Sequence, residues 1–374
     1  MKTLIYADHA ATTALSNSAR EAMEPFLQTS YGNPSTLHSF SVEPRKAVYR
    51  SREMIAAVIH AEPDEIFFTS GGTEADNWAI KGTIFQHVPG KKVITSVIEH
   101  HAVLNTCVAL SRMGYPVITL PVDTEGHVDP IMLRGSITPD VALVSVMLAN
   151  NEIGTINPLG DLAAEAHNGG VLCHTDAVQA IGHISVNVND LNVDFLSASA
   201  HKFNGPKGIG FLYVRRGTKL LPLIDGGGQE LGMRSGTENV AGIVGMAIAL
   251  QEHNENLSQE TEYLQGLTKR LLSRLEQYHL DFRVNGSLNR VPGNLNLSFK
   301  NADAEMLLHR LDLMGTAVAT GSACNSKEKE LSHVIQAIHV PHDYAHGTIR
   351  ITLGMDNRES DIDKIAEQIA KILS

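Results

Sequence analysis

The stretch of sequence that decides the fold reads Ser197-Ala198-Ser199-Ala200-His201-Lys202-Phe203-Asn204-Gly205-Pro206-Lys207-Gly208. It lies between the apolar runs 193–196 and 210–214, so we predict a loop that joins two buried strands. A lysine at the end of a core strand resists burial unless it is paired or used chemically. On its own, Lys202 is better explained as a side chain that extends to the surface at the strand end.

A second strand end changes the interpretation of Lys202. The apolar run Val171-Leu172-Cys173-His174-Thr175-Asp176 ends in a carboxylate. A desolvated lysine can form a Schiff base with a carbonyl cofactor. Pyridoxal 5'-phosphate (PLP) needs such a lysine for its aldehyde and a carboxylate that keeps its pyridine nitrogen protonated. Lys202 and Asp176 are therefore a candidate PLP pair.

From residue 66 onward, apolar strands alternate with helical patterns. We predict strands at 66–69, 93–98, 117–121, 142–148, 171–176, 193–196 and 210–214. Repeating strand–helix units with nearly continuous apolar strands indicate an α/β fold with a mostly parallel sheet covered on both faces. Ligands of such sheets bind outside the carboxyl ends of the strands. Polar side chains follow five of the predicted strand ends: Thr73, His100, Asn151, Asp176 and Lys202.

Three of these strand ends also allow a purely structural explanation. Gly71-Gly72-Thr73-Glu74 opens a helix and suits a phosphate group, but it is equally a tight turn. Asn150 and Asn151 are either turn formers or ligands of a cofactor or substrate. The His100 ring either stacks on a flat cofactor or is a partly buried, hydrogen-bonded side chain. Neighbouring His101 faces the other side of an extended chain and no HExxH is present, so we expect no metal site.

The last third of the chain has a different pattern. We predict two helices, Thr237–Leu250 and Glu260–Leu280, followed by strands at 294–299, 316–320 and 349–353 and helices at 303–313 and 360–373. Asp303 is well placed as a helix N-cap. The pattern indicates a smaller α+β domain of residues 1–14 and 256–374, beside a large cofactor-binding domain of residues 15–255.

Two polar side chains in this last third are candidates for chemistry. Cys324 lies in Gly321-Ser322-Ala323-Cys324-Asn325-Ser326, the setting of an exposed reactive thiol, although an incidental free cysteine also fits. Arg350 lies within a strand pattern, where it either binds a carboxylate bidentately or faces solvent. Four nearby histidines lack metal-site spacing, and we expect them at the surface: His333, His339, His342 and His346.

The overall composition narrows the class of function. The 374 residues carry a net charge of −11, which argues against a general nucleic-acid or anionic-membrane surface. No apolar run is long enough to cross a bilayer, and the first ten residues show no signal peptide. The three cysteines, Cys107, Cys173 and Cys324, form no CxxC pair. We therefore expect a cytoplasmic protein without a direct nucleic-acid or membrane partner.

Taken in order along the chain, these segments resemble those of the cysteine desulfurases, a branch of the class V aminotransferases. The matching segments are Ala7-Asp8-His9-Ala10-Ala11-Thr12-Thr13, Gly32-Asn33-Pro34-Ser35, Glu99-His100 and residues 69–77, 150–155, 174–180, 199–208, 234–240 and 321–324. The resemblance implies the type I fold of PLP-dependent transferases, as in aspartate aminotransferase. In that fold a large domain with a mostly parallel central sheet accompanies a smaller α+β domain.

The resemblance also implies a role for each matching polar residue. Lys202 would carry the cofactor, Asp176 would pair with its pyridine nitrogen, and His100 would stack on its ring and help to move protons. Gln179 would contact the ring oxygen, and the phosphate would be bound by Thr73, Ser199 and His201. Thr237 would bind the phosphate of the partner subunit. Asn151 would contact the cofactor and the substrate, and the substrate would also be bound by Arg350 and Asn33.

The implied enzyme is a homodimer with shared active sites that removes sulfur from L-cysteine. L-alanine would leave, and a persulfide on Cys324 would pass its sulfur to an acceptor protein, a tRNA thiolase or an iron–sulfur scaffold. Two alternatives on the same fold are a PLP-dependent aminotransferase, which would not need Cys324, and a selenocysteine lyase. A third alternative, a catalytically silent subunit, would have lost Lys202 or Asp176, and both are present.

Overall fold

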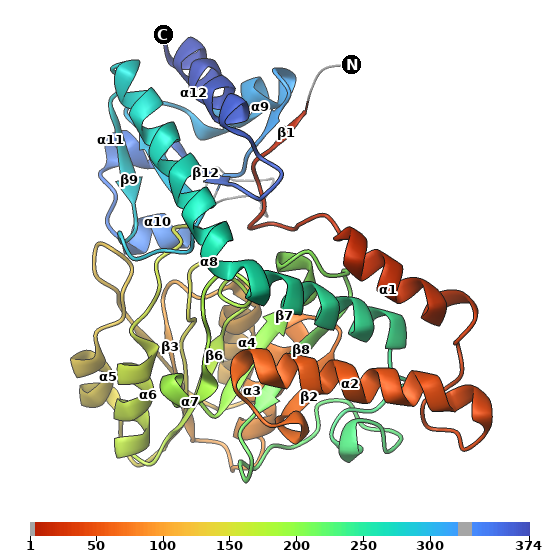
Figure 1. Ribbon diagram of the computed structural model, residues 1–374. Coiled ribbons are helices and arrows are strands. Elements are labelled where there is room, and N and C mark those ends of the chain that lie inside the picture. The colour runs from red at the N-terminus through yellow and green to blue at the C-terminus, as the bar shows by residue number, and fades with distance from the viewer. Residues whose placement is uncertain (1–3, 321–330) are drawn as a thin grey trace.

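The computed structural model describes residues 4–320 and 331–374, and its central element is a seven-stranded sheet (Figure 1). The strands are β2 (Ile66–Thr69), β3 (Lys92–Ser96), β4 (Val117–Leu120), β5 (Val141–Ser145), β6 (Leu172–Asp176), β7 (Phe195–Ser199) and β8 (Gly210–Val214). They lie in the order β2-β8-β7-β6-β5-β3-β4. Only β8 in this sheet runs against its neighbours. The predicted mostly parallel sheet is confirmed.

Helices cover both faces of this sheet because its inner strands are buried along their whole length. One face packs against α1 (Asn17–Gln28), α2 (Val42–Ile59), α5 (Pro130–Ser136), α6 (Leu159–Asn168), α7 (Val188–Leu191) and the first half of α8 (Val240–Gln277). The other face packs against α3 (Gly72–Ile84) and α4 (His101–Arg112), where Trp78 and Val103 are fully buried. The carboxyl ends of β2 and β3 lead directly into the amino ends of α3 and α4, at the edge where ligands of such sheets bind.

A separate apolar core holds the C-terminal part of the chain. A three-stranded antiparallel sheet in the order β12-β10-β9 combines β9 (Phe282–Asn285), β10 (Asn294–Phe299) and β12 (Thr348–Thr352). It packs with the second half of α8, α9 (Ala304–Leu313) and α12 (Glu359–Leu373). The remaining elements are α10 (His333–Ala337), α11 (His342–Ala345) and the parallel pair β1 (Ile5–Tyr6) and β11 (Thr316–Ala317). Oδ1 of Asp303 accepts the Met306 amide at 3.0 Å and caps α9 as predicted.

The prediction of two helices between residues 237 and 280 is wrong, because the structure has one helix of 38 residues, α8. The intervening residues 251–259 include no glycine or proline, so nothing in the chain ends the helix there. Nδ1 of His253 also lies 2.8 Å from Oε2 of Glu260, which is about two turns further along the same face of the helix. Figure 1 shows α8 passing from its place beside α1 and α2 to α12, so it joins the two cores. The boundary near residue 255 remains a prediction.

The predicted strands 93–98, 142–148 and 316–320 end two or three residues earlier than expected, at Ser96, Ser145 and Ala317. The chain turns directly after β3, whereas after β5 it continues as buried extended chain. Beyond β5, the amides of Val146 and Leu148 still donate to the carbonyls of His174 (3.1 Å) and Asp176 (2.9 Å). The chain therefore follows β6 to its carboxyl end and carries the next loop to the edge where a ligand is expected.

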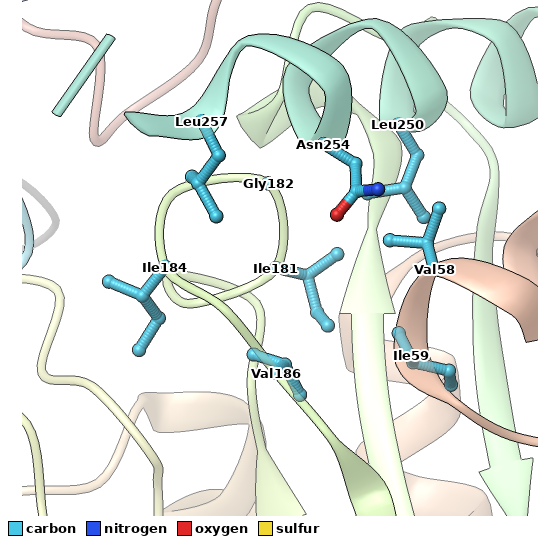
Figure 2. Close-up of a pocket in the computed structure, with 9 residues that line it drawn as sticks. All are labelled: Val58, Ile59, Ile181, Gly182, Ile184, Val186, Leu250, Asn254 and Leu257. Atoms are coloured by element: carbon cyan, nitrogen blue, oxygen red, sulfur yellow. The ribbon is translucent and has the colours of Figure 1, made fainter. Parts of the chain in front are cut away.

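Figure 2 shows a small pocket between α2, α8 and the segment 181–186. Its walls are apolar apart from Asn254, and the full lining is Val58, Ile59, Ile181, Gly182, Ile184, Val186, Leu250, Asn254 and Leu257. Its volume of about 10 Å³ has room for no more than one water molecule. None of these nine residues belongs to the predicted site. Among the helices that the structure describes, none combines the length and apolar character needed to cross a membrane.

Candidate active site

Lys202 lies directly after β7, in a 3-10 turn over Ala200–Lys202. Its Nζ donates hydrogen bonds to the carbonyl oxygens of Ala10 at 2.6 Å and Ala11 at 2.9 Å. These carbonyls belong to the N-terminal segment, about 190 residues away in the sequence. Two neutral acceptors thus hold the amine at the carboxyl edge of the sheet, where the sequence predicted it.

The surroundings of Lys202 favour its uncharged form. Burial lowers the pKa of the amine to about 8, and the guanidinium of Arg350 acts in the same direction. The carboxylates of Asp176 and Asp8 oppose this shift only in part. A sizeable fraction of Lys202 is therefore neutral near pH 8 and available as a nucleophile or base.

Asp176 is the last residue of β6 and is 5% exposed. Its Oδ1 accepts a hydrogen bond from the Val178 amide at 2.9 Å. Burial raises the pKa of this carboxyl, against the opposing influence of His100, the Val178 amide and Lys202. The protein's own groups thus leave the charge of a buried carboxylate incompletely balanced. A cationic ring nitrogen is the kind of group that would balance it.

His100 is the N-cap of α4, and its ring lies close enough to Asp176 and Lys202 for their charges to influence it. Its Nδ1 accepts the Ala102 amide at 3.1 Å, so the proton of the neutral ring resides on Nε2. Burial of the ring lowers its pKa, the Asp176 carboxylate opposes this, and Lys202 and His101 reinforce it. The ring is therefore a neutral, fixed surface with one N–H to donate, which suits stacking on a flat ligand.

The amino end of α3 provides backbone donors for an anion. Within the described residues, no side chain caps this helix of 13 residues, whose N-cap is Gly71. A Cβ on Gly72 would lie 2.5 Å from Cγ2 of Val178, so only glycine allows this close approach. The first N–H groups of α3 have no capping side chain among the described residues and Thr73 is exposed, which suits a phosphate group.

Ser199 and His201 extend this anion site from β7. A Cβ built on Gly71 would lie 3.5 Å from Oγ of Ser199, so the two elements are in contact. Nδ1 of His201 lies 3.1 Å from Oγ1 of Thr12. Burial and the charge of Lys202 lower the pKa of His201 to about 4, so its ring is neutral at pH 7 and binds by hydrogen bonding.

Arg350 does not face solvent, which was one of its two expected positions. It is 8% exposed on β12; Nη1 donates to the carbonyl of Asn151 at 2.9 Å and Nη2 to Oδ1 of Asp8 at 2.7 Å. Its Nε is buried without a hydrogen-bond partner in the described part of the chain. The guanidinium is therefore held in one orientation with donors left for a carboxylate. Gln179 lies nearby and donates from Nε2 to the carbonyl of Ala10 at 2.9 Å.

The structure separates the roles of the two adjacent asparagines. Oδ1 of Asn150 accepts the amides of Glu152 at 2.8 Å and Ile153 at 3.0 Å, and Nδ2 donates to the carbonyl of Ile98 at 2.9 Å. Asn150 is therefore a buried turn former. Asn151 is half-buried at the same edge, where its carbonyl holds Arg350.

Sequence reasoning missed two buried acids, Asp76 and Glu99, behind Asp176. Burial raises the pKa of Asp76 well above its usual range, and the nearby charges of Asp176 and Glu99 add to this. Oδ1 of Asp76 and Oε2 of Glu99 have no hydrogen-bond partner among the described residues. Buried His174 lies 3.6 Å from Asp76, but burial lowers its pKa to about 3, so it supplies no cation. Burial also raises the pKa of Glu99, to about 8, so Glu99 is mostly neutral at pH 7, and no local sequence pattern signals the raised pKa of either acid.

Replacing Glu99 with glutamine is expected to change how stability depends on pH. Burial raises the pKa of Glu99 from 4.5 to about 8, while Ser96 and the Met147 amide bind its Oε1. The folded state therefore holds a proton that the unfolded state loses, and wild-type stability falls as pH rises from about 4.5 to about 8. Relative to wild type, the Glu99→Gln protein should gain up to about 1.4 kcal/mol per pH unit.

Urea denaturation of the cofactor-free proteins at pH 5, 6, 7 and 8, at one protein concentration, measures this difference. Glu262→Gln, at an exposed position of α8, is the matched control and should follow the wild-type profile. Parallel profiles for Glu99→Gln and wild type would show that Glu99 is ionised in the folded state.

The three remaining predicted site residues are Asn33, Thr237 and Cys324. Asn33 is exposed on the connection between α1 and α2, where its Oδ1 accepts the Ser35 amide at 2.9 Å. Thr237 is exposed on the segment before α8. Cys324 falls outside the described residues, so its predicted role has no structural test here. The roles of Asn33 and Thr237 as ligands stay predictions.

The expectation that all four C-terminal histidines lie at the surface is wrong for His333. Its ring is half-buried, its Nε2 lies 3.1 Å from the Glu99 carbonyl, and its centroid is 5.1 Å from that of His101. His339, His342 and His346 are exposed. Across residues 4–320 and 331–374, no group of three or more histidine, cysteine, aspartate or glutamate side chains is arranged to hold a metal ion.

The residues at the carboxyl edge of the sheet together fit PLP. The uncapped end of α3 with its close glycines suits the phosphate, and the incompletely balanced Asp176 suits a protonated ring nitrogen. Lys202, with its lowered pKa, suits the aldehyde. These three features meet the three chemical demands of this cofactor, and they come from the ends of different strands of one sheet.

Comparison with known proteins gives matches over the full chain. The family model described as aminotransferase class-V matches residues 5–365. Relatives named cysteine desulfurase IscS include one from Dictyoglomus turgidum, 49% identical over 375 residues, with 100% of this chain and 95% of the relative covered. Another, from Clostridium botulinum strain Hall, is 46% identical over 377 residues, again with 100% of this chain and 95% of the relative covered.

Solved structures agree with these matches. A NifS-like protein superposes with a TM-score of 0.93 at 38% identity, and 99% of each chain is covered. A structure described as SspA in complex with cysteine gives a TM-score of 0.84 at 34% identity, with 94% of this chain and 99% of that chain covered. With its fold, its site and its full-length relatives in agreement, the chain belongs to the class V aminotransferase family, within the cysteine desulfurase branch.

Proposed function

We propose that this protein is a PLP-dependent cysteine desulfurase that converts L-cysteine to L-alanine and leaves the sulfur as a persulfide on Cys324. The observation that carries the proposal is the position of Lys202 and Asp176 at the ends of adjacent strands, the first as a partly neutral amine and the second as a buried acid. The names of the relatives support cysteine as the substrate, and one neighbouring structure is described as a complex with cysteine.

Bound PLP would supply an electron sink that stabilises negative charge at the substrate's α-carbon. Arg350 binds the substrate carboxylate, because its guanidinium is already oriented by Asp8 and Asn151. The Lys202 amine takes the α-proton, since its pKa of about 8 makes it a base near neutral pH. The His100 ring would stack on the cofactor ring, and its Nε2–H is free to donate because Nδ1 accepts the Ala102 amide.

Sulfur then moves from the substrate to Cys324. The thiolate of Cys324 forms an S–S bond with the substrate sulfur while the substrate Cβ–S bond breaks, and the electron pair of that bond stays with carbon. Protonation of carbon gives alanine, so one thiol and one cysteine become one persulfide and one alanine without an external oxidant or reductant. The persulfide is the form in which sulfur passes to an acceptor protein, a tRNA thiolase or an iron–sulfur scaffold.

We also propose a homodimer with shared active sites. The connection between α1 and α2 exposes large apolar side chains, among them Tyr31, Phe40 and Leu37, the last 95% exposed. Leu231, 76% exposed, precedes Thr237 on a segment that Glu230 joins to α2. Monomeric proteins rarely expose so many large apolar side chains in one region, so this surface supports contact with a second copy. Such a contact would bring Thr237 and Asn33 to the partner subunit's site.

The proposal is tested by alanine release from L-cysteine, with PLP and a reductant, for wild type and Cys324→Ser. Wild type is expected to release alanine, and the variant to lose at least about 100-fold of that rate, because a serine hydroxyl is a poor nucleophile toward sulfur. Equal rates would remove Cys324 from the reaction and overturn the proposed persulfide. A strong preference for selenocysteine over cysteine in wild type would favour the lyase.

A further inference from the structure

The segment from Gly226 to Asn239, here called the 226–239 segment, is anchored at both ends and exposed near its centre. At one end, Glu230 forms a bidentate ion pair with Arg52 at 2.9 and 2.6 Å, and its Oε2 also accepts the Phe68 amide at 2.9 Å. At the other end, Asn239 caps α8 through the Gly242 amide at 3.1 Å. These anchors fix where the exposed part of the segment lies.

The backbone at the first anchor is strained. Glu230 and Leu231 have φ values of 47° and 58°, a region that non-glycine residues rarely adopt. Such strain persists only where surrounding contacts over-determine the conformation, and it concentrates at functional sites. The buried Glu230–Arg52 pair is that contact here. The conformation of the 226–239 segment is therefore imposed by the fold rather than preferred by its sequence.

A second ion pair joins the 226–239 segment to the amino end of α3. Nε and Nη2 of Arg234 donate to the two carboxylate oxygens of Glu74 at 2.8 and 3.0 Å. Oε2 of Glu74 also accepts the Ser70 amide at 2.8 Å. The side chains of Arg234 and Glu74 are only 21% and 11% exposed, so solvent screens this pair weakly. Glu74 follows the Gly71–Thr73 turn and binds the amide of Ser70, which precedes it, so the Arg234–Glu74 pair holds both ends of the turn. The glycines of this turn and Thr73 form the anion site.

The residues that the segment exposes after Arg234 begin two positions further on, at Gly236. Ser235 is buried, with its Oγ donating to the Gly227 carbonyl at 2.7 Å, and the Gly236 amide donates to Oε1 of Gln229 at 3.1 Å. Gly236 and Thr237 themselves are exposed. One guanidinium therefore connects the anion site of its own subunit with the exposed Thr237, three residues further on.

We propose that Arg234 is a positioning residue for the cofactor phosphate at two sites. Through Glu74 it holds the phosphate-binding turn of its own subunit, and through the short link to Thr237 it sets the side chain offered to the partner subunit's phosphate. This inference rests on the proposed PLP-dependent homodimer. Loss of the Arg234–Glu74 pair would therefore weaken binding of the phosphate group while leaving the ring contacts, which come from β6, β7 and α4, unchanged.

Binding of PLP and of pyridoxal, which lacks the phosphate, separates these contributions. Dissociation constants are measured by absorbance titration of the full-length, cofactor-free proteins, with light scattering to record the oligomeric state. For Arg234→Gln we expect PLP to bind about 10- to 100-fold more weakly and pyridoxal to change less than about threefold. Arg234→Lys, which keeps the charge but not the bidentate geometry, should lie between wild type and Arg234→Gln.

Two further variants make the test specific. Arg216→Gln removes another bidentate pair, with Asp64 at 3.1 and 2.6 Å, on an exposed surface, and should leave both dissociation constants within about twofold of wild type. The double variant Glu74→Gln/Arg234→Gln should bind PLP no more than about twofold differently from Arg234→Gln, because the two residues act as a unit.

The outcomes distinguish this inference from the function on which it rests. If wild type binds PLP and Arg234→Gln binds it equally well, the positioning role is wrong and the proposed function stands. If Arg234→Gln weakens PLP and pyridoxal by the same factor, the residue supports the fold rather than the phosphate, which also overturns the inference. If wild type binds no PLP, the proposed function fails and the inference fails with it.

Discussion

Replacing Lys202 with alanine is expected to lower the rate of alanine release from L-cysteine by about 10³-fold or more. In the proposed function the same amine holds the cofactor and takes the α-proton, so the substitution would remove both functions. The lowered pKa of about 8 and the two carbonyl acceptors of Ala10 and Ala11 show that the site is built around a neutral amine at this position.

The measurement is alanine formed per minute at pH 8 with excess PLP, together with the mass of the protein after borohydride reduction. Borohydride should fix the cofactor to wild type and not to Lys202→Ala. Lys219→Ala is the matched control, because Lys219 is exposed and no part of the site, and it should keep the wild-type rate within about twofold. A Lys202→Ala protein that kept a tenth of the wild-type rate would refute the assigned role.

Asparagine at position 176 is expected to lower kcat by about 10²- to 10³-fold while the cofactor stays attached to Lys202. Asparagine keeps the oxygen that accepts the Val178 amide and removes only the negative charge. A buried carboxylate next to a ring nitrogen keeps that nitrogen protonated, and without it the ring is a weaker electron sink. The loss should therefore appear in the chemical step rather than in KM.

Asp194→Asn is the matched control for Asp176→Asn. Asp194 is also buried and also accepts a strand amide, that of Cys173 at 2.8 Å, but it lies near the opposite end of β6. Its replacement should lower the midpoint of urea denaturation and leave kcat of the folded enzyme within about threefold of wild type. Similar losses of kcat in the two variants would mean that burial of a carboxylate, rather than its position, explains the effect.

Much of the site was predictable because its key residues follow from local patterns. Lys202 and Asp176 each end an apolar run, and the rule that parallel strands expose ligand sites at their carboxyl ends brings them to one edge. The same logic placed Thr73 at the start of α3 and His100 at the start of α4. Each of these placements depends on a few neighbouring residues, and a sequence carries that information directly.

The tertiary structure decided what depends on residues distant in the sequence. Asp8 reaches Arg350 across 342 residues, and the carbonyl of Ala10 reaches Lys202 across 192. α8 continues through residues 251–259, where the sequence pattern suggested a break, and so joins two apolar cores that no local pattern connects. Long-range contacts of this kind follow from how layers pack, and no periodicity within a segment encodes them.

The sequence by itself determined which residues carry chemistry and at which edge of the sheet they meet. Only the tertiary structure decided their electrostatic state. The pKa values of the Lys202 amine and the Glu99 carboxyl depend on how much water the surrounding chain excludes and which charges it supplies. Desolvation is a property of the assembled core, since each group is buried by elements from other parts of the chain.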